Sequence, residues 1–366
     1  MNVLFVIKRF SGTIGKDAVR DDFGREMRLA AGIAKRHNVM VIAADHLRKE
    51  SFSVRMHGMD VRVVPFSFFR IFSFLKSVSS FAKGVDVVVG ATHPVVALLA
   101  FLSRSGRKFV YDLRDNYETY DLSGVPLLRN GFFARCLLRF VNKFLIRKAA
   151  LCVCVSRSLQ EKIRGVCSGS VVVENGFEPV FRPLSRAKCR ASLKLPKDAV
   201  IITYVGHISG ERGADVLVDA FSIVRQAFPE AILLLSGKVD NDIDITKQGI
   251  VHMALPRREE VVAAINSADV AILPQPENEV SRYGFAYKLM EYLACNVSLV
   301  ATSVGDVAVV LGDYPECLAV PGSAADLAAK IVSAVKKGKK PDFRRLVLPY
   351  SWLSLSGRFS DALEAL

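Results

Sequence analysis

The sequence predicts an α/β fold made of two doubly wound domains, each a mostly parallel sheet with helices on both faces. Short apolar runs alternate with amphipathic segments along the chain, as expected for parallel strands joined by crossover helices. The 366 residues suffice for two domains with separate cores. Prolines 179, 183 and 196 indicate a linker. We expect one domain over residues 1–180, a second over 181–348, and a terminal helix over 349–366.

The first half contains short, valine-rich runs that are typical of strands buried on both faces. The segment 23–36 follows the first of them and has the apolar spacing of a helix. The expected strands are Val3–Ile7, Val39–Ala43, Val61–Val64, Val85–Val89, Phe109–Asp112, Leu151–Val155 and Val171–Val173.

The second half repeats this alternation and ends in a helical pattern. The expected helices are 214–228, 324–335 and 352–366. The expected strands are Val200–Val205, Ile232–Leu235, Ile250–Met253, Val270–Leu273, Val297–Ala301 and Cys317–Val320.

Composition narrows the classes of protein. With 51% hydrophobic and 23% charged residues, a disordered chain is excluded. No apolar run is long enough for a membrane span, the start lacks the layout of a signal peptide, and the seven cysteines form no C-x-x-C pair. A reducing cytoplasm is therefore expected. The net charge of +14 favours an anionic partner. Nucleic acid is not expected, because no nucleic-acid-binding motif accompanies the charge.

The stretch 281–302 carries the strongest candidate site. Gly284, Tyr287, Lys288 and Glu291 have the spacing of one helix face, so we expect a helix that begins at Gly284. Its free N–H groups and dipole would suit an anion. The alternative is a surface ion pair between Lys288 and Glu291, worth about 0.3–0.5 kcal/mol.

This stretch resembles the nucleotide-sugar site of retaining glycosyltransferases of family four, which have the GT-B fold of two Rossmann-like domains facing an interdomain cleft. In that family a Glu precedes a second Glu that opens EAMA or EYMA, and G-x-P-V-V-A-T follows. Here Glu291 opens EYLA, and Val300-Ala-Thr matches the end of the motif. The sequence departs at three positions: Tyr283 replaces the first Glu, Asn296 the Gly, and Ser298 the Pro.

The resemblance extends to the loop 206–213, where the family holds the donor diphosphate with an Arg and a Lys. Here Arg212 stands at the Lys position and His207 at the Arg position, after Gly206. Arginine keeps the charge and adds a bidentate fork, whereas His207 is only partly protonated near neutrality. The alternative is a plain glycine-rich turn between a strand and a helix.

Three segments of the first half are candidates because they follow expected strands, where α/β sheets place ligands. Gly24 stands where the family has a glycine-rich donor-binding turn, followed by Glu26, although an ordinary turn is equally consistent. Arg114 and Asp115 resemble a segment that faces the acceptor, although Asp115 could instead only cap the next helix. His93 is similarly placed, with a structural role as its alternative.

A basic helix is expected over 132–148, and a phenylalanine-rich run covers 66–81. The basic residues Arg135, Arg139, Lys143 and Arg147 recur every fourth position, and the apolar residues Phe133, Leu137, Phe140, Val141 and Phe144 are expected to lie away from them. Such a helix can rest on an anionic membrane surface. The alternative is a helix with its apolar face in the core and its charges in water.

The resemblance implies a metal-independent hexosyltransferase without a cofactor, which transfers a sugar from a nucleotide-diphosphate donor to a glycan, lipid-linked or other surface-polysaccharide acceptor. Arg212, Lys288 and Asp115 are the expected catalytic residues. The expected donor-binding set is Gly206, His207, Arg212, Gly284, Tyr287, Lys288, Glu291 and Gly24, and the acceptor-side set is His93, Arg114 and Asp115. The enzyme is expected in the cytoplasm, at the membrane face. The alternatives are an inactive GT-B subunit and a nucleotide-sugar epimerase.

Overall fold

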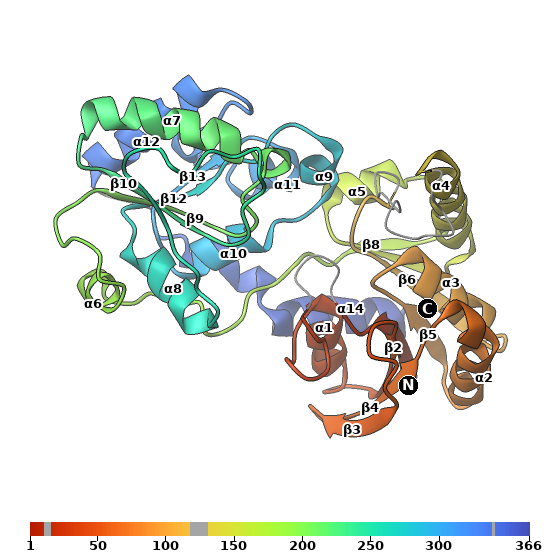
Figure 1. Ribbon diagram of the computed structural model, residues 1–366. Coiled ribbons are helices and arrows are strands. Elements are labelled where there is room, and N and C mark those ends of the chain that lie inside the picture. The colour runs from red at the N-terminus through yellow and green to blue at the C-terminus, as the bar shows by residue number, and fades with distance from the viewer. Residues whose placement is uncertain (11–15, 118–130, 339–340) are drawn as a thin grey trace. The chain divides into compact units, whose positions relative to one another are not determined.

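The computed structural model describes residues 1–10, 16–117, 131–338 and 341–366. They form two compact units, drawn in Figure 1. Unit 1 comprises Met1–Glu174 and Trp352–Leu366, and unit 2 comprises Asn175–Ser351. The chain thus passes from unit 1 to unit 2 six residues before the expected boundary, and the terminal segment belongs to unit 1.

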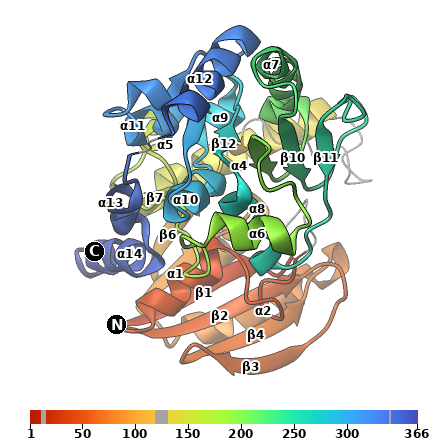
Figure 2. The same cartoon turned by 90° about the vertical axis from the view of Figure 1, so that its left-hand side faces the viewer.

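Unit 1 is built on a sheet that has the order β3-β4-β2-β1-β5-β6-β7-β8 in the described part of the chain (Figures 1 and 2). All neighbouring strands are parallel except β3 and β4, which are antiparallel. The strands are β1 (Asn2–Lys8), β2 (Asn38–Asp45), β3 (Phe52–Met56), β4 (Met59–Pro65), β5 (Val87–Gly90), β6 (Lys108–Leu113), β7 (Leu151–Cys154) and β8 (Ser170–Val172).

Strand β3 was not predicted. It is an edge strand with a mostly exposed, partly polar sequence, so it lacks the continuous apolar run that marks the other strands. A tight turn through His57 and Gly58 joins it to β4, and both residues have positive φ angles, 52° and 79°. Such a turn suits glycine.

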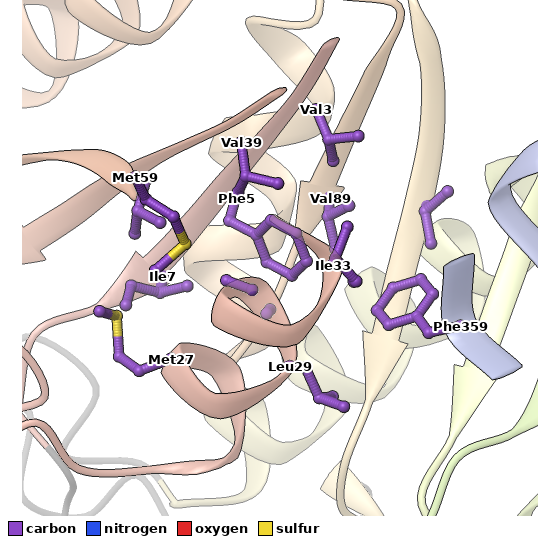
Figure 3. Close-up of a cluster of buried hydrophobic side chains, with 14 of the residues drawn as sticks. Val3, Phe5, Ile7, Met27, Leu29, Ile33, Val39, Met59, Val89 and Phe359 are labelled. Carbon is purple, nitrogen blue, oxygen red and sulfur yellow. The ribbon is translucent and has the colours of Figure 1, made fainter. Parts of the chain in front are cut away.

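Helices cover both faces of this sheet. One face carries α1 (Arg25–Ile33) and α14 (Trp352–Glu364), whose side chains share a core cluster with β1, β2 and β5 (Figure 3). The other face carries α2 (Ile71–Ala82), α3 (Pro94–Leu102) and α4 (Gly131–Lys148), with α3 packed against both neighbours (Figure 1). The short helices η1 (Phe68–Arg70) and α5 (Arg157–Lys162) complete the unit.

The contact between α1 and α14 is close because Gly32 faces Ser356. A Cβ atom on Gly32 would lie 2.0 Å from the Ser356 Oγ, so any larger residue would push the two helices apart. Next to this contact, the rings of Phe5 and Phe359 meet edge to face with centroids 6.1 Å apart (Figure 3). The terminal helix is therefore part of the core of unit 1.

Unit 2 contains a fully parallel sheet, with the order β11-β10-β9-β12-β13-β14 among the described residues. Helices α7 (Ala214–Ala227) and α12 (Ala324–Lys337) pack together on one face, and α8 (Arg258–Ser267) and α10 (Tyr287–Ala294) contact the sheet as well. The strands are β9 (Ile201–Val205), β10 (Ile232–Ser236), β11 (Ile250–His252), β12 (Val270–Leu273), β13 (Leu299–Thr302) and β14 (Leu318–Ala319). The remaining elements are α6 (Arg186–Ser192), η4 (Gly210–Arg212), α9 (Glu279–Tyr283), α11 (Gly305–Val310), η5 (Pro315–Cys317), α13 (Arg344–Val347) and η6 (Leu348–Tyr350).

Both units thus confirm the predicted α/β class of parallel sheets covered by helices, with β3 as the antiparallel exception. Within the described residues, no helix is both long and apolar enough to cross a lipid bilayer. All seven cysteines are free thiols.

The buried ring of Phe359 provides a test of the terminal helix. Phe359 is fully buried, so Phe359→Ala should lower the free energy of unfolding by about 3–5 kcal/mol, through lost burial and the remaining cavity. Leu353→Ala on the same helix should change it by less than about 0.5 kcal/mol, because Leu353 is 62% exposed. Urea unfolding measures both values, and equal effects would contradict the assignment of this helix to the core.

Candidate functional site

The loop that follows β9 brings together two residues predicted for the donor site. Gly206 has a φ angle of 136°, and a Cβ atom there would lie 2.0 Å from Cε and 2.5 Å from Nζ of Lys288. The lysine side chain therefore lies directly over the Gly206 backbone, with its ammonium 5.3 Å from the centre of the Tyr204 ring. Only glycine leaves room for this approach.

The turn at Arg212 is held by the segment that follows β12. Gly213 has a φ angle of 76°, and a Cβ atom there would overlap the Pro274 carbonyl oxygen at 1.8 Å. From the same segment, Asn278 Nδ2 donates to the Glu211 carbonyl oxygen at 3.1 Å. The Arg212 side chain is half-buried and makes no ion pair within the described residues. Helix α7 begins directly after this turn, so its free N–H groups lie near the same edge.

His207 is engaged by a neighbour from the next loop. Its Nε2 lies 2.8 Å from Asp240 Oδ1, and Tyr204 Oη donates to its carbonyl oxygen at 2.9 Å. The contact with His207 holds the pKa of Asp240 below its ordinary value. His207 is thus oriented by a carboxylate, which offsets any positive charge that the imidazole could offer to a phosphate.

The predicted helix start at Gly284 is wrong. Gly284 ends α9, and α10 begins only at Tyr287. The chain turns at Gly284 because it approaches the Val280 carbonyl oxygen closely: a Cβ atom would lie 2.6 Å from it. Tyr287, Lys288 and Glu291 remain together in α10, with Tyr287 exposed and the other two half-buried. Gly284 supplies a break between two helices rather than the N-terminus of one.

The departure at Asn296 has a structural explanation. This residue has a φ angle of 52°, a left-handed conformation that glycine adopts most easily and that asparagine tolerates. Its Oδ1 also accepts a hydrogen bond from the Phe343 N–H at 3.0 Å. Asparagine therefore serves at the position where the family usually has glycine.

In unit 1, the end of β6 and the start of α1 bring together another predicted set. Arg114 Nη1 donates to Glu26 Oε1 at 2.8 Å, and Arg114 Nε donates to Asp115 Oδ2 at 3.3 Å. Burial alone would raise the pKa of Glu26, but the nearby Arg114 outweighs it and the pKa is lowered. Gly24 precedes α1 with a φ angle of 105°, which fits the glycine-dependent turn expected there.

The sequence pattern did not predict a buried ion pair that involves the residue before Glu26. Arg25 Nη2 lies 3.0 Å from Asp112 Oδ1, and both side chains are fully buried. Arg25 Nη1 also donates to the Glu174 carbonyl oxygen at 2.7 Å. The sequence did contain a signal for this pair. Asp112 and Arg25 are charged residues within segments expected to be buried, and a buried charge needs a partner.

His93 has the structural role that was given as its alternative: it caps a helix shortly after the end of β5. Its Nδ1 accepts from the Val95 N–H at 3.2 Å and caps α3. Burial, followed by the charge of Lys8, lowers the pKa of His93 to about 4. Lys8 ends β1 and His46 follows β2, and the sequence pattern did not single out either residue.

Part of the expected basic pattern on α4 is confirmed and part is wrong. Arg135, Arg139, Lys143 and Arg147 are exposed, as predicted. Leu137 and Phe140, which were expected to lie away from the basic residues, are exposed at 53% and 71% among them. Val141, from the same expected apolar set, is buried, as is Leu145, because α4 contacts its unit through only a narrow stripe. The side chain of Phe133 is outside the described set.

Within the described residues, no group of three or more His, Cys, Asp or Glu side chains is arranged to hold a metal ion.

Two family models match the chain, one in each half. The family described as Glycosyltransferase Family 4 matches residues 27–180, and the family described as Glycosyl transferases group 1 matches residues 199–337.

Curated relatives share part of the sequence. A D-inositol 3-phosphate glycosyltransferase of Saccharomonospora viridis is 28% identical over 158 residues, 38% of this chain and 36% of the relative. The putative teichuronic acid biosynthesis glycosyltransferase TuaC of Bacillus subtilis is 26% identical over 194 residues, 51% of this chain and 47% of the relative. The matches therefore span less than half of the length of either relative.

Solved structures share the fold over the full chain. Sucrose-phosphate synthase from Thermosynechococcus elongatus aligns with a TM-score of 0.72 and 16% identity, covering 100% of this chain and 98% of the other. Anabaena HepE, solved in complex with UDP and glucose, aligns with a TM-score of 0.68 and 18% identity, covering 100% and 99%. Together with the two family matches, this shows that the chain belongs to glycosyltransferase family 4 and has the GT-B fold.

Proposed function

We propose that the protein is a retaining glycosyltransferase that transfers a sugar from a nucleotide-diphosphate donor to a glycan, lipid-linked or other surface-polysaccharide acceptor. The observation that carries the proposal is the close approach of Lys288 to Gly206, next to the turn that presents Arg212. These groups form a cationic edge at the carboxyl ends of the strands of unit 2, where α/β sheets bind nucleotides.

In this proposal, charge neutralisation drives the chemical step. Negative charge grows on the diphosphate as the sugar leaves, and Lys288, Arg212 and the N-terminus of α7 would stabilise it. Glu291 would not contact the phosphates, because like charges repel, and its carboxylate suits the ribose hydroxyls. Such a site needs no divalent metal, so we propose metal-independent turnover without a cofactor.

The acceptor is proposed to bind unit 1 at Arg114, Asp115 and His93, with Asp115 positioned to act on the acceptor hydroxyl. One relative, named for teichuronic acid biosynthesis, supports a polysaccharide acceptor, whereas the other is named for inositol 3-phosphate. A cytoplasmic site of action is proposed with it.

A second candidate is an inactive subunit that binds the nucleotide without transferring the sugar. The bond between His207 and Asp240 favours it, because it occupies the imidazole at the position of a family arginine. Incubation with donor and a lipid-linked acceptor separates the possibilities. Transfer supports the enzyme, an altered free donor indicates an epimerase, and binding alone indicates the inactive subunit.

We also propose that unit 1 binds reversibly to the cytoplasmic face of an anionic membrane. On α2 and the preceding turn, Phe69 and Phe72 are 94% and 82% exposed. On α4, Leu137 and Phe140 are exposed among basic residues. Because α3 packs between α2 and α4, these side chains belong to one layer of helices. Exposed aromatic rings and cations together suit a lipid headgroup region.

The donor site is tested by nucleotide binding. After a thermal-shift screen of UDP, GDP and ADP, calorimetry should show that Arg212→Ala and Lys288→Ala each weaken the selected nucleotide roughly 10- to 150-fold. This range corresponds to about 1.5–3 kcal/mol for a charge-assisted hydrogen bond. Glu291→Gln should weaken it as well, through the ribose. Lys336→Ala removes an exposed charge of the same unit and should have no effect. Unchanged affinity in all three site variants would contradict the assignment of the donor site to this edge.

Metal independence is tested by removing metals from an active preparation. Turnover should persist in excess EDTA, because the proposed site neutralises the diphosphate with side chains and N–H groups. Added Mg²⁺ or Mn²⁺ should raise the rate less than twofold. Activity that disappears in EDTA and returns with either ion would refute this part of the proposal.

Membrane binding is tested by sedimentation with vesicles. The protein should sediment with phosphatidylglycerol vesicles at low salt and remain in solution with phosphatidylcholine, because each basic residue near an anionic surface contributes about 1 kcal/mol. High salt should weaken this binding by screening. Replacing Phe69 and Phe72 with Ser should reduce it at least fivefold, whereas Leu353→Ser, an exposed change on α14, should not. Equal amounts of protein left in solution with both lipids would contradict the proposed membrane-binding surface.

A further inference from the structure

Basic side chains lie at the carboxyl ends of four adjacent strands, along one edge of the unit 1 sheet. In the order β2, β1, β5 and β6, these strands lie side by side and run in parallel. His46 follows β2, Lys8 ends β1, His93 follows β5, and Arg114 follows β6. The Lys8 N–H donates to Thr92 Oγ1 at 3.2 Å, which ties the end of β1 to the residue before His93.

Lys8 is a half-buried cation in unfavourable surroundings. Burial lowers the pKa of its ammonium, and the positive charge of Arg114 lowers it further. Among the residues that the structure describes, no carboxylate forms an ion pair with it. A desolvated ammonium close to another cation is costly, and an arriving anion would relieve that cost.

Two histidines lie at the same edge. Since His93 Nδ1 accepts from the Val95 N–H, the neutral ring carries its proton on Nε2 and can donate it. His46 Nδ1 is buried and has no hydrogen-bond partner within the described residues. Its ring packs edge to face on Phe10, with centroids 6.1 Å apart, so it is held in place.

The carboxylates nearby are engaged by other groups. Glu26 and Asp115 both accept hydrogen bonds from Arg114, and Asp45 pairs with the buried Arg9 at 2.8 Å. Arg114 therefore has carboxylate partners, whereas Lys8 forms no ion pair with the residues that the structure describes.

We propose that Lys8, His93 and His46 bind an oxyanion group of the acceptor, a phosphate or a carboxylate, at this edge of unit 1. Only the assignment of the anion to an acceptor rests on the proposed function; the anion site itself stands on the geometry of unit 1. Lys8 supplies the charge, and the histidines supply directional hydrogen bonds beside it. Acceptor selection then depends on an acidic group, with Lys8 as the residue that determines it.

Three sugars that differ only at C6 test the site: D-glucose, D-glucuronate and D-glucose 6-phosphate. Their titration is followed through the histidine ring signals in ¹H–¹⁵N NMR spectra of the full chain at pH 7. One or both charged sugars should shift the signals of His93 and His46 in a saturable way, and D-glucose should not. Which charged sugar binds distinguishes a carboxylate from a phosphate.

Lys8→Gln should weaken that binding at least tenfold, the size expected for losing one charge-assisted hydrogen bond. Lys8→Arg should retain most of it. Lys35→Gln removes an exposed charge of the same unit and should bind like the wild type. Circular dichroism and the melting temperature establish that each variant is folded. Equal shifts by D-glucose, or wild-type affinity in folded Lys8→Gln, would overturn the proposal.

The nucleotide calorimetry separates this proposal from the proposed function. If the nucleotide binds normally while Lys8→Gln leaves sugar-acid binding unchanged, only the anion site fails. If no nucleotide binds but the charged sugars still depend on Lys8, the anion site stands and the donor assignment fails.

Discussion

A buried ion pair between Arg25 and Asp112 organises the carboxyl edge of the first sheet. Because both side chains are fully buried, each needs the other, and removing one partner of such a pair typically costs about 3–5 kcal/mol. Arg25 also binds the Glu174 carbonyl oxygen, while the Glu174 carboxylate pairs with Arg358 of the terminal helix at 2.6 Å. The pair therefore ties the start of α1, the end of β6 and the terminal helix together. The position of the Glu26–Arg114 pair follows from it, since Glu26 is the next residue of α1.

In the second unit, the carboxyl edge of the sheet is organised by glycines that let other segments come close to the backbone. Gly206 and Gly213 flank the loop after β9, and each lets another segment come nearer than any Cβ atom would allow. One of these segments carries Lys288, and the other is the chain at Pro274 after β12. In both units, cations lie at the carboxyl ends of parallel strands, the edge at which α/β sheets generally bind ligands.

The predicted elements were most accurate where an apolar run met a clear turn, as for β9 and α7. They were least accurate where local pattern and tertiary contact disagreed. The spacing from Gly284 to Glu291 is helical, yet the close approach of Gly284 to Val280 breaks the segment into two helices. Leu137 and Phe140 have core-like chemistry, but the narrow contact of α4 leaves them exposed. Strand β3 has no apolar run, and its pairing with β4 comes from the hairpin.

The sequence by itself determined the α/β class, the division into two units and the family, because apolar periodicity and a motif such as that around Glu291 are local properties of the chain. It also indicated Lys288 from the spacing of a helix face, Arg212 from the family resemblance of its loop, and Arg114 and Asp115 from their place after a strand. Only the tertiary structure decided which residues meet. Arg25 and Asp112 are 87 positions apart, and Lys8, His46 and His93 lie at or after the ends of three different strands. Their proximity depends on the order and register of parallel strands, which local pattern does not encode.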